Sequence, residues 1–527
     1  MLNGAPDFWR SEGTTQRSSL LAKPQFWALL PLVYLALLST WVGFDNLVAR
    51  LVNDDQSYYI LVAHNLYARG PSYDGLYLTN GVHPLFTALL GALYVLPVPF
   101  GGLAAASVLT CVLFGCGFVL VLLRAGPAHL ATRIGIVALA SSIAVYPILY
   151  RGMEGALAVL VIGVYLTAAR RGQASTRLWC VASVALWAAR LELLALPPLV
   201  IFLGYRASCL RPGQARGMLT GWCCSLVAFA LYASASYRWI GLALPVSGLI
   251  KQSSVTILPN FVALGICCAV ASIVLEAVPR LRRSARRAWM THCMLSFAAV
   301  FYLAHAWGQQ DTERQTWYYF PVPALLAFGL FELGGTLPAW FRRGTAAFAL
   351  AVAAAATFWE GSFVIPLRGE AWRAMRSVAD AAKRAAGPGE RFMGPGWMAL
   401  LVGPEFEPFS QDGLVGGAAQ YRAIREGRLM EFAYASGVRF LVMSSPAPAA
   451  LVPPQVQPSW QLTLVSEGPV PNGGSLWASL GRGDQCGLGR CESFLAIYRL
   501  SPARTDVASA GRHAAPTPRA HVLPGPS

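Results

Sequence analysis

Long apolar runs constrain this chain more than any other feature of its sequence. The first, at residues 26–44, is nearly unbroken, and a helix of that length covers about 30 Å, the thickness of a bilayer's hydrocarbon core. Further apolar segments follow at about 83–97, 101–123, 134–150, 155–169, 178–203, 217–236, 257–277, 289–306, 319–336 and 345–360. The pattern predicts a polytopic α-helical membrane protein with about 9–11 transmembrane helices.

Composition supports this class, because hydrophobic residues make up 55% of the chain and charged residues only 13%. The first run is not a cleaved signal peptide, since a charged tail precedes it and no small-x-small site follows it. The net charge of +16 does not indicate nucleic-acid binding, because Arg residues concentrate in short loops, where they act as topology signals. Most Cys residues lie in or beside apolar segments without metal-ligand spacing, as small buried side chains do.

Clusters of Arg residues predict which helix ends face the cytoplasm. Their members are Arg170, Arg171 and Arg177; Arg206, Arg211 and Arg216; Arg280, Arg282, Arg283, Arg286 and Arg287; and Arg342 with Arg343. Simple alternation of every apolar segment cannot put all clusters on one side. The conflict disappears if segment 83–97, which is short and ends in prolines, is re-entrant and returns to the outer face. Segment 178–203, with Arg190 and Glu192 in its middle, then predicts two short helices meeting near the outer surface.

With this topology, one face of the membrane collects the unusual polar residues. They are Asp54, Asp55, His64, His83, Arg151, Glu154, Arg190, Glu192, Arg238, Ser247, Lys251, Asp311, Glu313 and Arg314. A lone His or Glu at a helix end is usually structural. So many ionisable residues on one side of an apolar protein instead predict a polar cavity.

The hydropathy divides the chain into parts. We expect a cytoplasmic tail at 1–25, a transmembrane domain at 26–360 whose first external loop is 45–82, an extracytoplasmic α/β domain at 361–500, and a disordered tail at 501–527. Cys486 and Cys491 lie in a polar loop of the α/β domain. Their spacing permits a local disulfide in an oxidising compartment, and two unpaired thiols are the alternative.

Several motifs, taken in order, resemble those of a known superfamily. The loop NDDQSYY at 53–59 and the stretch DGLYLTNGVHPLF at 74–86 resemble the first external loop of GT-C-fold polyprenyl-phosphate-sugar glycosyltransferases. That superfamily includes protein O-mannosyltransferases, lipid A aminoarabinose transferases and mycobacterial arabinofuranosyltransferases. A bacterial subgroup has segments similar to RGMEGAL at 151–157, ARLELL at 189–194, LPVSGLIK at 244–251, WYYFPVP at 317–323 and SQDGLVGGAAQY at 410–421.

The resemblance implies a GT-C-like fold and an acidic residue of the first external loop that acts as catalytic base or binds a metal, which here means Asp55 or Asp54. Desolvation and a neighbouring carboxylate both raise a carboxyl pKa, which suits a base. Alternatively, Asn53 or Asp54 caps the following helix, with Gln56 completing a capping box. Asp54 and Asp55 are also the candidates for a divalent cation, and no other pattern calls for a metal or cofactor.

A departing phosphate accumulates negative charge, which nearby cations stabilise. The residues expected to bind the donor or its phosphate are His83, Arg151, Glu154, Arg190, Glu192 and Lys251. Arg238 is a further candidate, with lipid headgroups as its alternative partner.

The resulting hypothesis is an inverting glycosyltransferase of the bacterial inner membrane, whose active site and C-terminal domain are extracytoplasmic. Its expected partners are a polyprenyl-phosphate-linked sugar, an acceptor that the sequence does not identify, and the bilayer. The competing hypotheses are a transporter or flippase of a lipid-linked or anionic substrate, and a non-catalytic relative. The placement of the ionisable residues on one face favours the enzyme, because alternating access needs a path through both faces.

Overall fold

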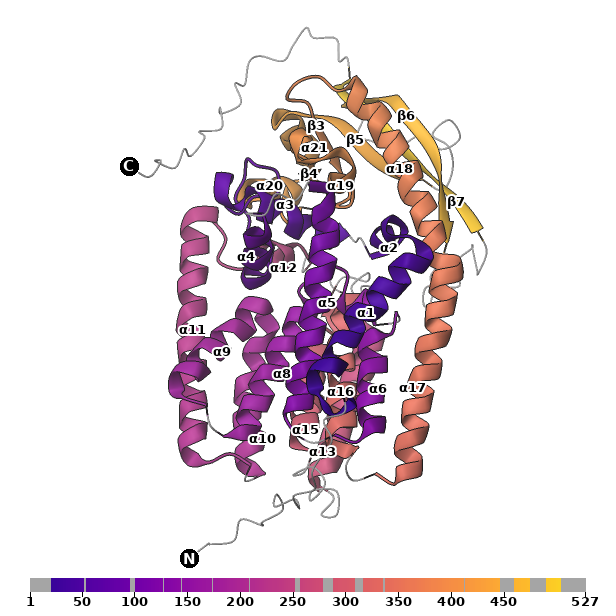
Figure 1. Cartoon of the computed structure of the whole chain (residues 1–527). Coiled ribbons are helices and arrows are strands. Elements are labelled where there is room, and N and C mark those ends of the chain that lie inside the picture. The colour runs from indigo at the N-terminus through magenta and orange to yellow at the C-terminus, as the bar shows by residue number, and fades with distance from the viewer. Residues whose placement is uncertain are drawn as a thin grey trace, which may run out of the picture.

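The computed structural model describes residues 20–51, 54–94, 100–126, 128–143, 145–172, 174–207, 209–251, 256–277, 288–308, 316–334, 337–411, 413–445, 459–473 and 490–503. Within these ranges a body of roughly parallel helices carries a small sheet domain at one end (Figure 1).

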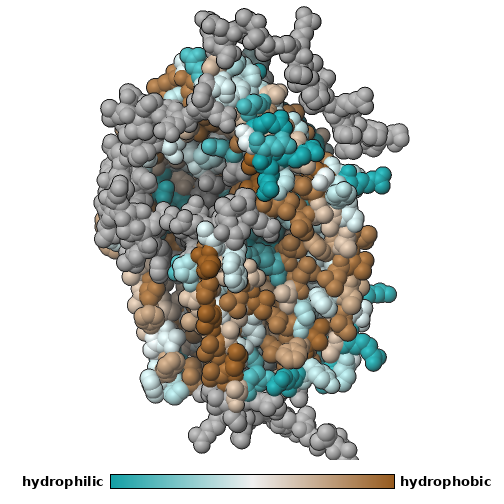
Figure 2. Space-filling view, turned by 180° about the vertical axis from the view of Figure 1, so that it is seen from behind, coloured by the Kyte–Doolittle hydropathy of each residue, from teal (hydrophilic) through white to brown (hydrophobic). Residues whose placement is uncertain are grey.

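Five helices of the described chain are long and apolar enough to cross a membrane. They are α1 (Pro24–Val42), α5 (Phe100–Arg124), α11 (Pro212–Ile240), α13 (Pro259–Ala277) and α17 (Ala339–Trp359), the last continuing into the C-terminal domain. Apolar side chains cover the middle of the molecule's visible face, and hydrophilic ones gather toward its two ends (Figure 2). This is the surface of a protein surrounded by lipid.

The other helices of the body are shorter. They are α4 (Pro84–Leu93), α6 (Leu130–Ser141), α7 (Tyr146–Leu149), α8 (Gly155–Arg171), α9 (Thr176–Ala189), α10 (Leu196–Arg206), α15 (Trp289–Ala304) and α16 (Pro321–Leu333). At about 1.5 Å per residue, none of these spans 30 Å by itself. Several therefore end inside the layer that the long helices cross, which brings chain breaks and polar backbone into the body.

The described Arg clusters gather at the end of the body opposite the sheet domain. Arg170 and Arg171 lie in the last turn of α8, and Arg206 in the last turn of α10. Arg211 precedes α11, and Arg342 with Arg343 lies in the first turns of α17. The cluster at 280–287 lies outside the described residues. One end of the molecule is thus rich in Arg, as the sequence predicts.

The short segment that starts at His83 does not cross the body. Helix α4 has 10 residues and lies beside α3 (Asp54–Arg69) and α12 (Val246–Lys251) at the end that carries the sheet domain (Figure 1). The segment 178–203 is interrupted, as expected: α9 ends at Ala189, Arg190 is extended, and the 3-10 helix η2 (Leu191–Ala195) leads into α10. Helix α9 rises about 21 Å, and the side chain of Arg190 at the break is buried.

The C-terminal domain combines a five-stranded sheet with short helices. The strands are β3 (Arg391–Gly394), β4 (Phe409–Ser410), β5 (Val438–Ser445), β6 (Trp460–Gly473) and β7 (Arg490–Pro502), in the order β4-β3-β5-β7-β6. Strand β3 is parallel to β4 and β5, whereas β7 is antiparallel to β5 and β6. The helices are α18 (Ile365–Ala385), α19 (Met398–Val402), α20 (Ala418–Arg425) and α21 (Leu429–Ala435).

An apolar core holds α18 against the sheet. Val378 and Ala382 of α18 pack in one buried cluster with Phe392 of β3, Phe440 of β5 and Ile497 of β7. The small C-terminal α/β domain is therefore confirmed. Its predicted disulfide is not tested, because Cys486 and the side chain of Cys491 lie outside the described residues.

Two further parts connect the body with this domain. The first external loop contains α2 (Phe44–Leu51), α3 and a turn closed by the bridge between Ser72 and Leu78. A two-stranded antiparallel ribbon pairs β1 (Thr256–Ile257) with β2 (Trp307–Gly308). The 3-10 helix η5 (Thr316–Tyr319) precedes α16.

Candidate active site

A cavity of about 370 Å³ lies where many helix ends meet, below the C-terminal domain. Its ionisable and polar lining residues are Asp55, Tyr58, Tyr59, His83, Glu154, Arg190, Glu192, Ser247, His305 and Tyr318. Nearly all of them stand at the start or end of an element. His83 precedes α4, Glu154 precedes α8, and His305 follows α15. The short helices described above therefore create this cavity by ending around it.

Arg190 is the centre of the cavity's charge network. Its Nη1 donates to Glu154 Oε1 at 3.0 Å, and its Nη2 and Nε donate to the two oxygens of Glu192 at 3.0 and 3.3 Å. Both Arg190 and Glu154 have side chains that are only 2% exposed. A fork of two donors on one carboxylate fixes orientation as well as charge. Arg190 therefore holds two carboxylates in place from a position between α9 and η2.

Aromatic rings surround the same guanidinium. Its central carbon lies 4.8 Å from the ring centroid of Phe320, 5.4 Å from that of Tyr318 and 5.8 Å from that of Phe301. Such rings attract a cation through their electron-rich faces and exclude water from it. The Arg190 charge is thus enclosed by two acids and three rings, which identifies it as a fixed structural centre of the cavity.

Two histidines extend the network on either side. His83 Nε2 lies 3.5 Å from Glu154 Oε1, and His305 Nε2 lies 3.4 Å from Glu192 Oε1. His305 Nδ1 is 2.8 Å from the Phe301 carbonyl oxygen. His305 thus has an oxygen acceptor beside each of its two ring nitrogens.

One oxygen of Glu154 is set apart from this network. Within the described part of the chain, Glu154 Oε2 is buried and makes no hydrogen bond, although Tyr59 lies near enough to interact with the carboxylate. A buried acceptor without a donor is uncommon in native proteins and calls for a physical explanation. The carboxylate lines the cavity, so a bound molecule could supply the missing donor.

Asp55 and its neighbours on α3 form the wall facing this network. Asp55 is half-buried in the first turn of α3 and lines the cavity together with Tyr59, one turn further on. Gln56 is fully buried, and its amide donates to the Ala104 carbonyl at 3.0 Å and to Ser107 Oγ at 2.5 Å, both on α5. Gln56 therefore does not complete the alternative capping box, because its amide faces α5 and its buried Oε1 makes no hydrogen bond within the described residues. Asn53 and the side chain of Asp54 lie outside the described residues.

The structure brings together most of the residues expected to bind the donor. His83, Glu154, Arg190 and Glu192 share one cavity with Asp55. Arg151 is half-buried just before Glu154 and does not line this cavity within the described set.

The remaining candidates are less defined or lie elsewhere. Lys251 ends α12, whose Ser247 and Leu249 do line the cavity, but its side chain lies outside the described residues. Arg238 is exposed in the last turn of α11, between Tyr237 and Trp239, which are 67% and 71% exposed.

Sequence reasoning missed several side chains of the cavity. Tyr318 and Phe320 belong to the WYYFPVP motif, and the aromatic rings of that motif were the available signal. His305 closes the apolar run of α15 at the same end as Glu154, and that position was the available signal. Tyr59 follows Asp55 by one helical turn, a spacing that puts both on one face.

No group of three or more His, Cys, Asp or Glu side chains in the described ranges is arranged to hold a metal ion. The pair of Asp54 and Asp55 stays a prediction as a divalent cation site, since only one of the two side chains is described.

A larger apolar groove of about 630 Å³ lies between α10 and α11. Pro198, Phe202, Tyr205 and Trp222 line it, and Arg206 is its one positively charged side chain among the described residues.

Comparison with known proteins supports the fold. No protein-family model matches this chain, and no curated protein matches it. Among solved structures, it is similar to ArnT from Cupriavidus metallidurans, which was crystallised bound to undecaprenyl phosphate. The TM-score is 0.52 at 15% sequence identity, over 88% of this chain and 97% of ArnT. The predicted GT-C-like fold, a polytopic helical membrane body with a small C-terminal domain, is thereby confirmed.

Proposed function

We propose that this chain is a membrane glycosyltransferase that moves a sugar from a polyprenyl phosphate carrier to an acceptor hydroxyl. One observation carries the proposal: a single cavity at the ends of broken helices joins Asp55 to the network of Glu154, Arg190 and Glu192. The fold shared with ArnT, whose structure contains undecaprenyl phosphate, supports the choice of carrier.

In the proposed step, the acceptor oxygen attacks the anomeric carbon of the donor sugar while the Asp55 carboxylate takes its proton. The bond between the anomeric carbon and the phosphate oxygen breaks, and its electron pair stays on the carrier phosphate. Attack from the face opposite the leaving group inverts the anomeric centre, and one carboxylate base is sufficient for such a reaction. Asp54 is the alternative base, since it precedes Asp55 at the start of α3.

Glu154 is suited to bind the sugar. Its buried Oε2 has no hydrogen bond within the described residues, so a sugar hydroxyl would satisfy it on binding. Arg190 would keep Glu154 and Glu192 ionised and oriented. Since the donors of Arg190 already face those two acids, we assign the direct phosphate contact to His83, which lines the cavity, and we keep Arg151 and Lys251 as expected donor-binding residues whose contacts the cavity lining does not include.

The carrier's apolar chain needs a route from the cavity to the lipid. A smaller cavity adjoins the first, sharing Gly81, Val82 and His83 with it and adding Trp187, Phe229 and Tyr232 between α9 and α11. Helix α11 exposes Val227 and Leu231 on its outer side. We assign the start of the prenyl chain to this aromatic cavity, which adjoins the apolar surface of α11.

The location follows from the proposed reaction and the charges. With the Arg-rich ends in the cytoplasm of a bacterial cell, the cavity and the C-terminal domain face the extracytoplasmic side of the inner membrane.

The test of catalysis compares Asp55→Asn with Asp45→Asn, an exposed acid of the same external loop that does not line the cavity. Loss of the base should lower transfer by on the order of 100-fold or more, whereas the control should transfer normally. Mass spectrometry of cell extracts measures the glycan product and the accumulated polyprenyl-phosphate sugar. Normal product in both Asp55→Asn and Asp54→Asn, at normal protein abundance, would refute the assignment of a base in this loop.

Carrier binding is tested separately with purified protein and undecaprenyl phosphate as the probe. A ligand that binds the folded state raises the melting temperature, so wild type should be stabilised. Trp187→Ala should weaken that shift, whereas Ile273→Ala, which removes an exposed side chain of α13, should not. An unchanged melting temperature of wild type at saturating lipid would argue against the carrier.

A further inference from the structure

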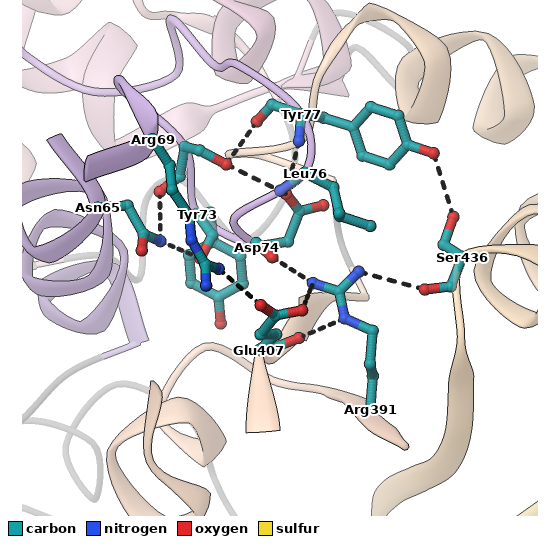
Figure 3. A network of polar contacts seen from close by, with 10 residues as sticks. Asn65, Arg69, Tyr73, Asp74, Leu76, Tyr77, Arg391, Glu407 and Ser436 are labelled. Carbon is teal, nitrogen blue, oxygen red and sulfur yellow. Dashed lines mark hydrogen bonds and ion pairs between the residues drawn. The ribbon is translucent and has the colours of Figure 1, made fainter. Parts of the chain in front are cut away.

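The C-terminal domain is fastened to the first external loop by a buried arginine. Arg391 opens β3 and is 3% exposed. Its Nε donates to the Glu407 carbonyl at 2.9 Å, its Nη1 to the Ser436 carbonyl at 3.2 Å, and its Nη2 to the Asp74 carbonyl (Figure 3). One side chain therefore ties two segments of the domain to the loop that contains α3.

Asp74 prepares the loop for this contact. Its buried carboxylate accepts from the backbone N–H groups of Leu76 and Tyr77, each at 2.9 Å, and from Ser72 Oγ at 3.2 Å. These bonds form a tight turn whose carbonyl faces Arg391 (Figure 3). Glu407 adds charge to the junction, with Oε2 3.6 Å from Arg391 Nη2 and Oε1 2.6 Å from Arg69 Nη1.

Apolar contacts join the same two parts beside this polar junction. Tyr58, Leu61 and Val62 of α3 form one buried cluster with Ala399 and Val415 of the domain. The helix that begins at Asp54 and Asp55 is therefore packed directly against the C-terminal domain.

The domain also reaches the cavity itself. Leu414 lines the cavity, although it is more than 200 residues away in sequence from the cavity-lining residues of the first external loop. Its backbone approaches Gly81 so closely that a Cβ on Gly81 would stand 2.1 Å from the Leu414 carbonyl oxygen. A Cβ on Gly417 would likewise stand 2.8 Å from Tyr77 Cβ. Only glycine permits these contacts.

We propose that the C-terminal domain is part of the active site. In this proposal, which rests on the proposed function, Leu414 forms the wall that contacts the acceptor and determines its selection. Arg391 is the positioning residue that holds this wall over the loop bearing Asp55. Among the described residues that line the cavity, Leu414 is the one that the C-terminal domain supplies.

The chemistry of Arg391 makes it hard to replace. Removing it leaves the Asp74, Glu407 and Ser436 carbonyls without its N–H groups, and leaves Glu407 with less positive charge nearby. A lysine carries the charge but lacks the planar fork that reaches three acceptors, so it should restore only part of the effect.

The experiment compares Arg391→Met and Arg391→Lys with Arg439→Met. Arg439 is a matched control, because it donates to the Tyr434 and Val438 carbonyls and covers the Tyr434 ring, all within the domain. Hydrogen exchange is measured at residues 72–81 and 413–417, together with sugar transfer and the melting-temperature shift by undecaprenyl phosphate. Arg391→Met should speed exchange in both segments and lower transfer by roughly 10-fold or more, with carrier binding retained. Arg391→Lys should be intermediate, and the control should match wild type.

Leu414→Ala provides the second variant, because it leaves the polar contacts of Arg391 in place and removes only the Leu414 side chain, which packs beside the apolar cluster of Tyr58 and Val415. It should raise the acceptor KM and leave carrier binding unchanged. The inference is overturned if Arg391→Met shows the hydrogen exchange and sugar transfer of the wild type. It is also overturned if Leu414→Ala leaves the acceptor KM unchanged. Absence of carrier binding and transfer in wild type would instead refute the proposed function, and exchange in Arg391→Met would then still decide whether Arg391 fastens the domain.

Discussion

At the scale of single residues, Asp74 shows how one buried side chain supports a junction between two parts of a protein. The carboxylate builds a turn through three donors, and the carbonyl of the same residue binds Arg391. Burial raises the pKa of Asp74 above its usual range, and the nearby Arg391 charge and the hydrogen bonds only partly offset this. Folding therefore disfavours the charged form of Asp74 relative to the unfolded chain.

This predicts a specific pH dependence for Asp74→Asn. The folded protein binds the proton of Asp74 more tightly than the unfolded chain, whose pKa is about 3.9. The contribution of Asp74 to the free energy of unfolding of the wild type should thus decrease as pH rises from about 3.9 through the raised pKa of Asp74. Asparagine keeps an acceptor for the turn and does not titrate.

Chemical unfolding of both proteins between about pH 3.5 and 7 measures the difference. Asp74→Asn should gain stability relative to wild type across this window and remain at least as stable at neutral pH. Asp74→Ala, which removes the acceptor, should lose about 1–3 kcal/mol throughout. A constant difference between wild type and Asp74→Asn would show that Asp74 does not titrate as expected.

The members of the site were largely predictable from sequence, whereas their partners were not. Asp55, His83, Glu154, Arg190 and Glu192 stood out as ionisable residues beside apolar segments, and they do share a cavity. Which of them pair depends on distances near 3 Å between residues far apart in sequence, such as Arg190 and Glu154. Hydropathy contains no such information, so Arg190 was expected to bind phosphate rather than two acids.

At the scale of elements, α17 and α18 form one continuous helix across the border between the body and the C-terminal domain. The π-helical turn Glu360–Val364 joins them. Glu360 forms a buried bidentate ion pair with Arg50 of α2. Arg50 Nε donates to Glu360 Oε2 at 2.8 Å, and Arg50 Nη2 donates to Glu360 Oε1 at 3.1 Å. A π-turn inside a helix often marks a functional position. Here it turns Glu360 toward the first external loop, just before α3.

We predict that Glu360→Gln strongly destabilises the protein, because it leaves the buried Arg50 charge without its partner. The expected loss is about 3–5 kcal/mol, against less than about 0.5 kcal/mol for Asp380→Asn, which breaks a surface pair on α18. Denaturant unfolding in a mild detergent measures both. Replacing Glu360 and Arg50 together by Met should recover part of the loss. Equal stability of Glu360→Gln and Asp380→Asn would contradict a structural role for this pair.

Helix positions were predicted better than helix ends. The run at 134–150 forms two helices, α6 and α7, and the run at 178–203 breaks at Arg190. Conversely, the change of hydropathy after Gly361 falls inside one helix. The reason is that hydropathy reports which residues meet lipid, whereas helix continuity depends on backbone hydrogen bonds that persist as the surroundings change.

At the scale of the whole molecule, the described Arg clusters beside the helices of the body lie at one end. The Arg-rich ends of α8, α10 and α17 lie opposite the cavity and the C-terminal domain. Such a division is the basis for an orientation in the membrane, since Lys and Arg remain on the cytoplasmic side.

Cysteine labelling in cells tests this orientation. Arg425→Cys on α20 and Arg343→Cys on α17 place single exposed thiols at opposite ends. A membrane-impermeant maleimide should label Arg425→Cys once the outer membrane is permeable, and Arg343→Cys only after the inner membrane is broken. Labelling of the parent protein gives the background from native Cys residues. The reverse order would invert the proposed topology and move the cavity to the cytoplasm.

The continuous helix from α17 to α18 has a mechanical consequence. It runs for 47 residues, or about 70 Å, from the Arg-rich end through the apolar layer into the core of the C-terminal domain. A rod of this kind works as a lever: when a thinner or thicker bilayer changes the tilt of α17, the far end sweeps sideways. Arg50 ties the middle of this rod to the first external loop through Glu360, and Arg391 ties the domain at its far end to the same loop. A change in the tilt of α17 would therefore reach the loop that contains α3.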